Sequence, residues 1–223
     1  VISNTDKSPQ HFAWSPDGPW TPIALQGSIA NCNNPAPFVH KNGTYYVVCR
    51  PDYQLWRTDD VLSGVWQAVS NITNHNGSDW RSWSLPNQLD GHYEDPVLWI
   101  DSANNFHVIS HVYRMTADAK VCTTGHDGAI VSGHYFSADG HNWHASAVPP
   151  FGNTVKLLTK PVREQLFSTL ERPKLVLDED GNPTHLSNGA CTEPACSGPC
   201  ANCKYNCMDF TRVAPLDMTT MHQ

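Results

Sequence analysis

Short runs of alternating hydrophobic and polar residues dominate this chain of 223 residues. The run FVHKNGTYYVV predicts two short strands around Asn42-Gly43, a hairpin signal of the primed-turn type. VLWIDSANNFHVISHVY and KLVLDEDGNPTHL repeat the plan, with turns at Asp101-Ser102 and Asp180-Gly181. The stretch nearest to an amphipathic helix, 155–170, is interrupted by Pro161. The pattern therefore predicts an all-β protein.

Each of these hairpins begins with two polar residues and a proline. The three phrases are Asn33-Asn34-Pro35, Glu94-Asp95-Pro96 and Glu171-Arg172-Pro173. A second phrase alternates with the first and runs from Ser15 to Trp20, more loosely from Thr58 to Trp66, and from Ser137 to Trp143. In it Asp bonds nearby backbone N–H groups, Gly accepts a positive φ, and Trp anchors the next strand in the core. Repeats on this scale indicate an array architecture.

We expect one domain over residues 1–223, a β-propeller of the five-bladed type. Counting from the prolines predicts blades over about 31–80, 90–148 and 168–215. Residues 1–30 form the remnant of a first blade that is incomplete in this chain, and we expect the natural protein to extend N-terminally. An antiparallel sandwich is the alternative, but it does not explain two interleaved phrases in a fixed order.

Cysteines and glycosylation sequons indicate where the protein is found. Three Asn-x-Ser/Thr sequons begin at Asn42, Asn71 and Asn76. Together with dense cysteine they predict a secreted, extracellular glycoprotein with disulfide bonds. The pairing is not derivable, although Cys32 with Cys49 is plausible within one blade, and residues 190–208 read as a disulfide-stapled loop near the C-terminus. The cysteines are Cys32, Cys49, Cys122, Cys191, Cys196, Cys200, Cys203 and Cys207.

Charge and spacing exclude several kinds of partner. The net charge is −7, and the 14 Lys and Arg residues are scattered, which argues against nucleic acid and anionic membranes. No apolar run approaches the ~20 residues that span a bilayer, so we expect no membrane insertion. Cys200-x-x-Cys203 lacks a second Cys/His pair at zinc-site spacing, so no metal site is predicted there.

The residues before the three prolines are the candidates for chemistry. Innermost strands of propeller blades begin near the central channel, so aligning the prolines places Asn33, Glu94 and Glu171 in one ring. Asn34, Asp95 and Arg172 form the next ring. Glycoside hydrolysis needs one protonated and one ionised carboxyl group. Burial and like charges separate carboxyl pKa values, and Arg172 would keep one group ionised. The alternative is that these residues bond backbone at the blade starts.

These phrases resemble a known family. The order Asn-Pro-Ala-Pro, Glu-Asp-Pro, Glu-x-Pro is similar to the five-bladed propellers of glycoside hydrolase family 43. It resembles more closely a group of uncharacterised secreted eukaryotic propeller proteins. Their recurring sequence motifs are similar to GHYEDPVLWIDSANNFHVISH, GHYFSADGHNW and ERPKLVLDEDGNPTHLSNG, and the resemblance spans about residues 12–190. The resemblance implies that Glu171 is the general acid, that Asp95 orients and tunes it, and that hydrolysis inverts the anomeric carbon.

The chain departs from that family at two places. The family's catalytic base is an Asp on the first blade, whose opening strand has no counterpart in this chain. Asn34 does not replace it, because an amide cannot accept a proton from water at neutral pH. The family usually carries Gly where Arg172 stands, and an arginine there would crowd or recharge the sugar subsite.

Further candidates surround this centre. Glu94, Arg172, Asn34, His92 and His134 are the predicted substrate contacts, and hydrophilic core or rim positions are the alternative for the histidines. Related propellers often hold a cation or a water at the channel axis near a histidine, so His107 or His134 could contact one, the cation being for example calcium. No other cofactor is expected.

Two functions from different classes remain open. The first is carbohydrate binding or glycoside hydrolysis at the central mouth. The second is a non-catalytic structural propeller of an extracellular matrix or filament, which would self-assemble or bind other extracellular proteins.

Overall fold

Antiparallel β-sheet makes up nearly all of the regular structure. A computed structural model of the chain describes residues 10–13, 15, 17–26, 29, 32–50, 53–72, 92–115, 121–122, 132–146, 148–152, 154–157, 161–167, 169–191 and 210–216. No helix in these ranges is long and apolar enough to cross a bilayer. The predicted Cys-rich loop over 190–208 lies almost entirely outside the described residues.

Three sheets form the body of the protein. The first orders β3 (Asn33–Val39), β4 (Tyr45–Arg50), β5 (Gln54–Thr58) and β6 (Gln67–Asn71) in sequence, with a short 3-10 helix, Val61–Ser63, before β6. The second orders β7 (His92–Ile100), β8 (Phe106–Met115), β10 (Ser132–Ser137) and β11 (His144–Ala145), and β9 (Val121–Cys122) also pairs with β8. The third orders β14 (Thr169–Leu177), β15 (Pro183–Cys191) and β16 (Phe210–Pro215).

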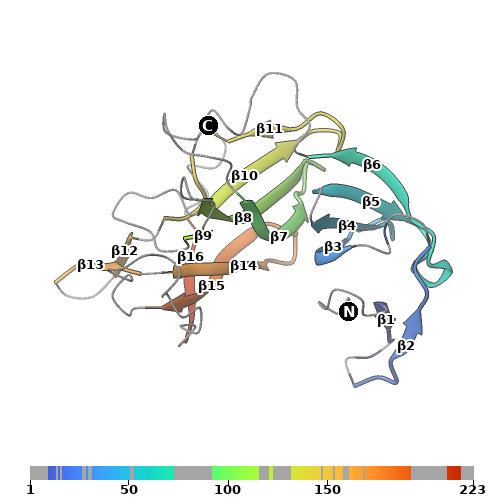
Figure 1. Ribbon diagram of the computed structural model, residues 1–223, viewed down its shortest axis with the longest axis horizontal. Coiled ribbons are helices and arrows are strands. Elements are labelled where there is room, and N and C mark those ends of the chain that lie inside the picture. Colours follow the sequence, from blue (N-terminus) through green and yellow to red (C-terminus); the bar gives the residue numbers. More distant parts are fainter. Residues whose placement is uncertain are drawn as a thin grey trace.

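Two short hairpins accompany these sheets. They are β1 (Gln10–Phe12) with β2 (Thr21–Ile23), and β12 (Thr154–Leu157) with β13 (Arg163–Leu166). The first strands of the three sheets lie innermost, and β7 contacts both β3 and β14. Later strands lie farther out, so the sheets spread as blades around a common centre (Figure 1). From here on, the first, second and third blades are the described sheets that begin with β3, β7 and β14, and the predicted remnant over 1–30 is not counted among them. The fold is the predicted all-β propeller type, and we call the region where β3, β7 and β14 begin the mouth.

The same turn joins the first two strands of every blade. The Gly43 N–H donates to His40 O at 2.8 Å, and the His40 N–H donates to Thr44 O at 2.9 Å. Equivalent bonds close the turns at 101–105 and 178–182, and the positive φ values are 91° at Gly43, 66° at Asn104 and 84° at Gly181. The hairpins are confirmed. The primed turn predicted at Asn42-Gly43 is wrong, because only the last turn residue is left-handed, as in a type I turn followed by a bulge residue.

The Asp-Gly-Trp phrase forms the predicted turn in two of its three copies. The Asp139 carboxylate accepts bonds from the His141 and Asn142 N–H groups at 2.7 Å each, and these bonds hold the pKa of Asp139 far below its usual range. Trp143 is buried at 2% exposure. Asp60 likewise accepts from Leu62 and Ser63 N–H groups ahead of buried Trp66. Trp20 differs, because 40% of it is exposed.

Apolar side chains fill the layers between neighbouring blades. Adjacent residues of β8 face opposite layers because side chains alternate along a strand. Val108 packs with Val48 and Leu55 of the first blade. Ile109 packs with Leu170 and Leu186 of the third blade. Fully burying a side chain of this size contributes about 1.5–3 kcal/mol, so the two layers hold the three blade starts in a fixed relation.

Candidate functional site

A β-bulge recurs at the start of each blade and shapes the mouth. The pairing register shifts between Asn33 and Ala36, between Glu94 and Val97, and between Glu171 and Lys174. Within each bulge the residue before proline is left-handed, with φ +51° at Asn34, Asp95 and Arg172. Such a conformation costs a non-glycine residue of order 1–3 kcal/mol, so the surrounding structure must hold it. The three backbones therefore bend alike and present their side chains from equivalent positions.

Two contacts join the first blade to the second across the mouth. The Asn34 Nδ2 donates to Asp95 Oδ1 at 2.8 Å. The guanidinium of Arg50 forms an ion pair with Glu94, and the two side chains are 28% and 24% exposed. Arg50 reaches this place because it pairs with Asn33 in the sheet register. An amide and an ion pair thus fix two carboxylates that come from the same short phrase.

Asp95 is a buried carboxyl group, 9% exposed. Burial is the main cause that raises its pKa, and the charge of Glu94 raises it further. The Asn34 hydrogen bond, Arg172 and Lys174 act in the opposite direction. The cations and the amide therefore only partly offset the cost of ionising a carboxyl group in this surrounding.

Glu171 is half-buried beside Asp95. Burial raises its pKa first of all, the charges of Asp95 and Glu94 raise it further, and Arg172 lowers it. No hydrogen bond to the Glu171 carboxyl group comes from any described residue. The expectation that Arg172 keeps one carboxyl group ionised meets a stronger opposing effect, because burial outweighs Arg172 at both Asp95 and Glu171. Both carboxyl groups therefore keep their protons to a higher pH than they would in water, which is the direction that a proton donor needs.

The histidines occupy other places. His92 lies on β7 opposite Tyr113, and its side chain is outside the described part. His134 lies in mid-blade, where its ring stacks with Trp99 and its Nε2 is 3.1 Å from His107 Nδ1. Burial and His107 lower the pKa of His134 to about 3, so it is neutral. The described residues contain no group of three or more metal-binding side chains. The substrate contacts and the axial cation stay predictions.

Three features at or near the mouth were not predicted from the sequence. Arg50 forms an ion pair with Glu94, and Lys174 lowers the pKa of Asp95. The position of Arg50 could have been found by pairing the two strands of the first hairpin outward from its turn until Asn33 is reached. Asn188 lies next to Gly189, the sheet partner of Glu171, at 1% exposure. Its amide has no hydrogen-bond partner among the described residues. Buried amides without partners are uncommon, and no sequence signal marks this one.

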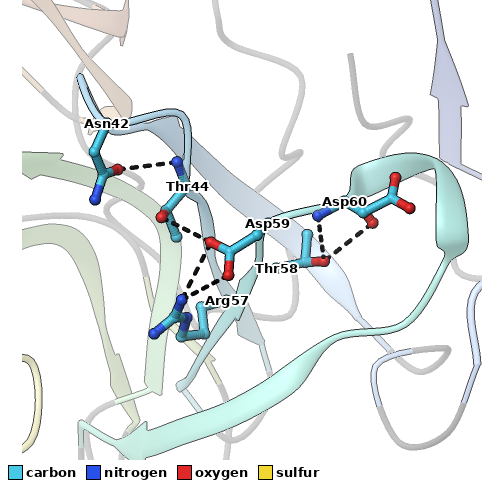
Figure 2. Close-up of polar contacts among 6 residues, drawn as sticks. All are labelled: Asn42, Thr44, Arg57, Thr58, Asp59 and Asp60. Carbon is cyan, nitrogen blue, oxygen red and sulfur yellow. Dashed lines mark hydrogen bonds and ion pairs between the residues drawn. The ribbon is translucent and has the colours of Figure 1, made fainter.

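The sequon at Asn42 lies on the exposed tip of the first hairpin (Figure 2). The Asn42 Oδ1 accepts a bond from the Thr44 N–H at 3.0 Å, and the Thr44 hydroxyl donates to Asp59 at 2.8 Å. Arg57 donates to the same carboxylate. The Asn42 amide nitrogen is left facing away from these contacts. Asn71 is half-buried at the end of β6, and Asn76 lies outside the described residues.

The predicted disulfide between Cys32 and Cys49 is confirmed, with an Sγ–Sγ distance of 2.09 Å. It fastens the segment before β3 to the end of β4, directly behind the first bulge. The backbones of Cys122 and Cys191 lie in β9 and β15. The remaining predicted disulfide cysteines, Cys196, Cys200, Cys203 and Cys207, lie outside the described residues.

Comparison with known proteins gives similarities in structure alone. No protein-family model matches the chain, and no curated protein sequence matches it. An endo-arabinase from Bacteroides thetaiotaomicron has a TM-score of 0.49 at 13% identity, over 94% of this chain and 65% of that one. An endo-1,4-beta-xylanase from the same organism has a TM-score of 0.46 at 15% identity, over 86% and 60%.

A variant of the GH43 protein BlXynB from Bacillus licheniformis has a TM-score of 0.46 at 13% identity, over 81% of this chain and 29% of that one. The chain thus spans less than two thirds of each of these proteins. At these identities and TM-scores no residue's role is carried over from those proteins, and each role rests on the geometry of the mouth.

Proposed function

We propose that this protein binds carbohydrate at its mouth and hydrolyses a glycosidic bond there. The observation that carries the proposal is Glu171, a half-buried carboxyl group whose pKa is raised by burial and by Asp95. A general acid must keep its proton near the working pH, and burial next to a second carboxylate is how glycosidases achieve this. The proposal also agrees with the resemblance of the sequence to glycoside hydrolase family 43.

Each group at the mouth has a role in this scheme. Glu171 gives its proton to the leaving oxygen as the bond between that oxygen and the anomeric carbon breaks. Asp95 raises the pKa of Glu171, and Asn34 orients Asp95 through its 2.8 Å hydrogen bond. Water then adds to the anomeric carbon. With inversion, the base for that water lies about 6.5–9.5 Å from the acid, and this role is not assigned to a described residue.

The same proposal includes secretion and glycosylation. The Cys32–Cys49 disulfide is typical of proteins from oxidising compartments. The exposed Asn42 amide leaves room for a glycan. Mass spectrometry of protein secreted from eukaryotic cells, before and after N-glycosidase treatment, tests this. Asn42→Gln should remove one glycan; an unchanged mass would contradict occupancy at Asn42.

Hydrolysis of 4-nitrophenyl α-L-arabinofuranoside and 4-nitrophenyl β-D-xylopyranoside tests the catalytic part. Glu171→Gln keeps the shape of the side chain but has no proton to donate, so turnover should fall by about 10²–10⁴. Glu164→Gln is the matched control, because Glu164 is exposed on β13 and away from the mouth. Carbohydrate binding should survive in both variants, measured by calorimetry with arabinan and xylan oligosaccharides. Full activity of Glu171→Gln would overturn the assignment of the acid. Absence of both turnover and carbohydrate binding in the unmodified protein would overturn the proposal and favour the non-catalytic structural propeller.

A further inference from the structure

The cations at the mouth fall into two groups. Arg50 is neutralised by its ion pair with Glu94. Arg172 and Lys174 are exposed on β14, and neither forms an ion pair with a described residue. If these two residues served only to balance Asp95 and Glu171, contacts like that of Arg50 would be expected. Arg172 and Lys174 are instead close enough to influence Asp95 electrostatically without forming an ion pair with a described residue.

Both free cations lie on the side of the mouth that holds Asp95 and Glu171. Arg172 has the bulge position that Asn34 has in the first blade, and Asn34 contacts Asp95 directly. Lys174 follows the same bulge two residues later. Arg172 and Lys174 each influence Asp95 electrostatically, and Arg172 also influences Lys174. Two like charges are therefore held near one another at the site of the proposed reaction.

The charge balance changes with the proton on Glu171. When Glu171 holds the proton that a general acid needs, the remaining carboxylates at the mouth among the described residues are Glu94 and Asp95. The cations Arg50, Arg172 and Lys174 then outnumber them, and the surplus lies on β14. A neutral sugar leaves this surplus without a partner. A carboxylate on the sugar would pair with it, because a guanidinium donates two parallel hydrogen bonds to a carboxylate and an ammonium adds a point charge.

We propose that Arg172 and Lys174 form a subsite for the carboxylate of a uronic acid residue, so that the mouth accepts an acidic glycan. This inference rests on the proposed function, since it names the substrate class for the same site. Arg172 would contact the sugar carboxylate and fix its orientation beside Glu171. Lys174 would add charge from the neighbouring position on β14.

The test compares two ligands that share one sugar backbone, one with a charged carboxylate and one with an uncharged methyl ester in its place. Binding of an α-1,4-linked galacturonic acid oligosaccharide and of its methyl ester is measured by calorimetry with the intact protein at low and high salt. The acid should bind about tenfold or more tightly than the ester, with a difference that shrinks in salt. Arg172→Gln and Lys174→Gln should each remove most of that preference, so that the acid binds little more tightly than the ester. Lys156→Gln, on exposed β12, is the charge-matched control and should change nothing.

The outcomes separate the subsite from the proposed function. Equal affinity for acid and ester, or a preference that survives Arg172→Gln, overturns the subsite. Preference for a sulfated galactan over the uronate, removed by the same variants, overturns the carboxylate in favour of sulfate. Failure to bind either oligosaccharide, with hydrolysis of the neutral aryl glycosides intact, overturns the subsite and keeps the proposed function. Absence of oligosaccharide binding together with absence of aryl glycoside hydrolysis overturns the subsite and the proposed function alike.

Discussion

Removing the Asn34 side chain tests whether a hydrogen bond holds the mouth together. Asn34→Gly is the cleanest change, because glycine accepts the φ of +51° without strain. The lost bond joins an amide to the buried Asp95 carboxylate at 2.8 Å, and bonds to charged groups contribute about 1.5–3 kcal/mol. Glycine also adds about 0.4–1 kcal/mol of freedom to the unfolded chain. Asn34→Gly and Asn104→Gly both relieve a left-handed residue and both add freedom to the unfolded chain, but only the first loses the bond to Asp95. The free energy of unfolding at pH 7 should therefore be about 1.5–3 kcal/mol lower in Asn34→Gly than in Asn104→Gly.

The pH dependence of this loss identifies its cause. The bond favours ionised Asp95 and so lowers its folded-state pKa. Its stabilisation is present while Asp95 is ionised and disappears as the pH falls through the folded pKa of that group. Urea unfolding followed by tryptophan fluorescence should show a larger loss at pH 7 than at pH 3. Asn104→Gly is the control, since Asn104 is also left-handed but exposed, and it should change stability by about 0.5 kcal/mol or less. An equal loss at both pH values would refute the reasoning.

Three further changes test the fold and the carboxylates. Because folding raises the pKa of Glu171, the folded state binds that proton more tightly, and stability falls as pH rises from the ordinary value of 4.5 to the raised one. Glu171→Gln should therefore increase the free energy of unfolding at pH 7 but not below pH 4, and a decrease at pH 7 would contradict this. Leu170→Ala should cost about 2–5 kcal/mol in urea unfolding, while Leu166→Ala, 44% exposed, should cost far less; similar costs would argue against the layer between the blades. Replacing Cys32 and Cys49 by Ser opens a loop with a sequence separation of 17 and should cost about 3 kcal/mol; unchanged stability under the same assay would contradict that constraint.

Local features of the fold were predictable because the chain repeats them. Alternation predicted the hairpins, whereas the bulge at each proline phrase was found only in the structure. The Asp139 turn and the burial of Trp143 follow from short-range bonding that the Asp-Gly-x-x-Trp phrase encodes. Trp20 follows a form of the phrase that is one residue shorter, Asp17-Gly18-Pro19, and it is exposed.

The electrostatics of the mouth were less predictable. Aligning the prolines placed Asp95 and Glu171 in equivalent phrases, but the pairing of Arg50 with Glu94 depends on how two blades converge. The effect of burial on both carboxyl groups is likewise a property of the assembled layers, and it acts against the effect of Arg172 on their pKa values. Short-range hydrogen bonds can be predicted from the local sequence, whereas the ion pairs and pKa shifts at the mouth depend on how the blades pack together.

The most direct test of the account is a ¹³C NMR titration of the Glu171 carboxyl carbon in the intact protein. The account predicts a pKa above the ordinary value of 4.5, because burial and Asp95 both oppose ionisation. The pKa should fall in Asp95→Asn, which removes a neighbouring negative charge, and rise in Arg172→Gln, which removes a positive one. A Glu171 pKa at or below 4.5 that ignores both substitutions would contradict the central claim that the mouth holds a proton donor.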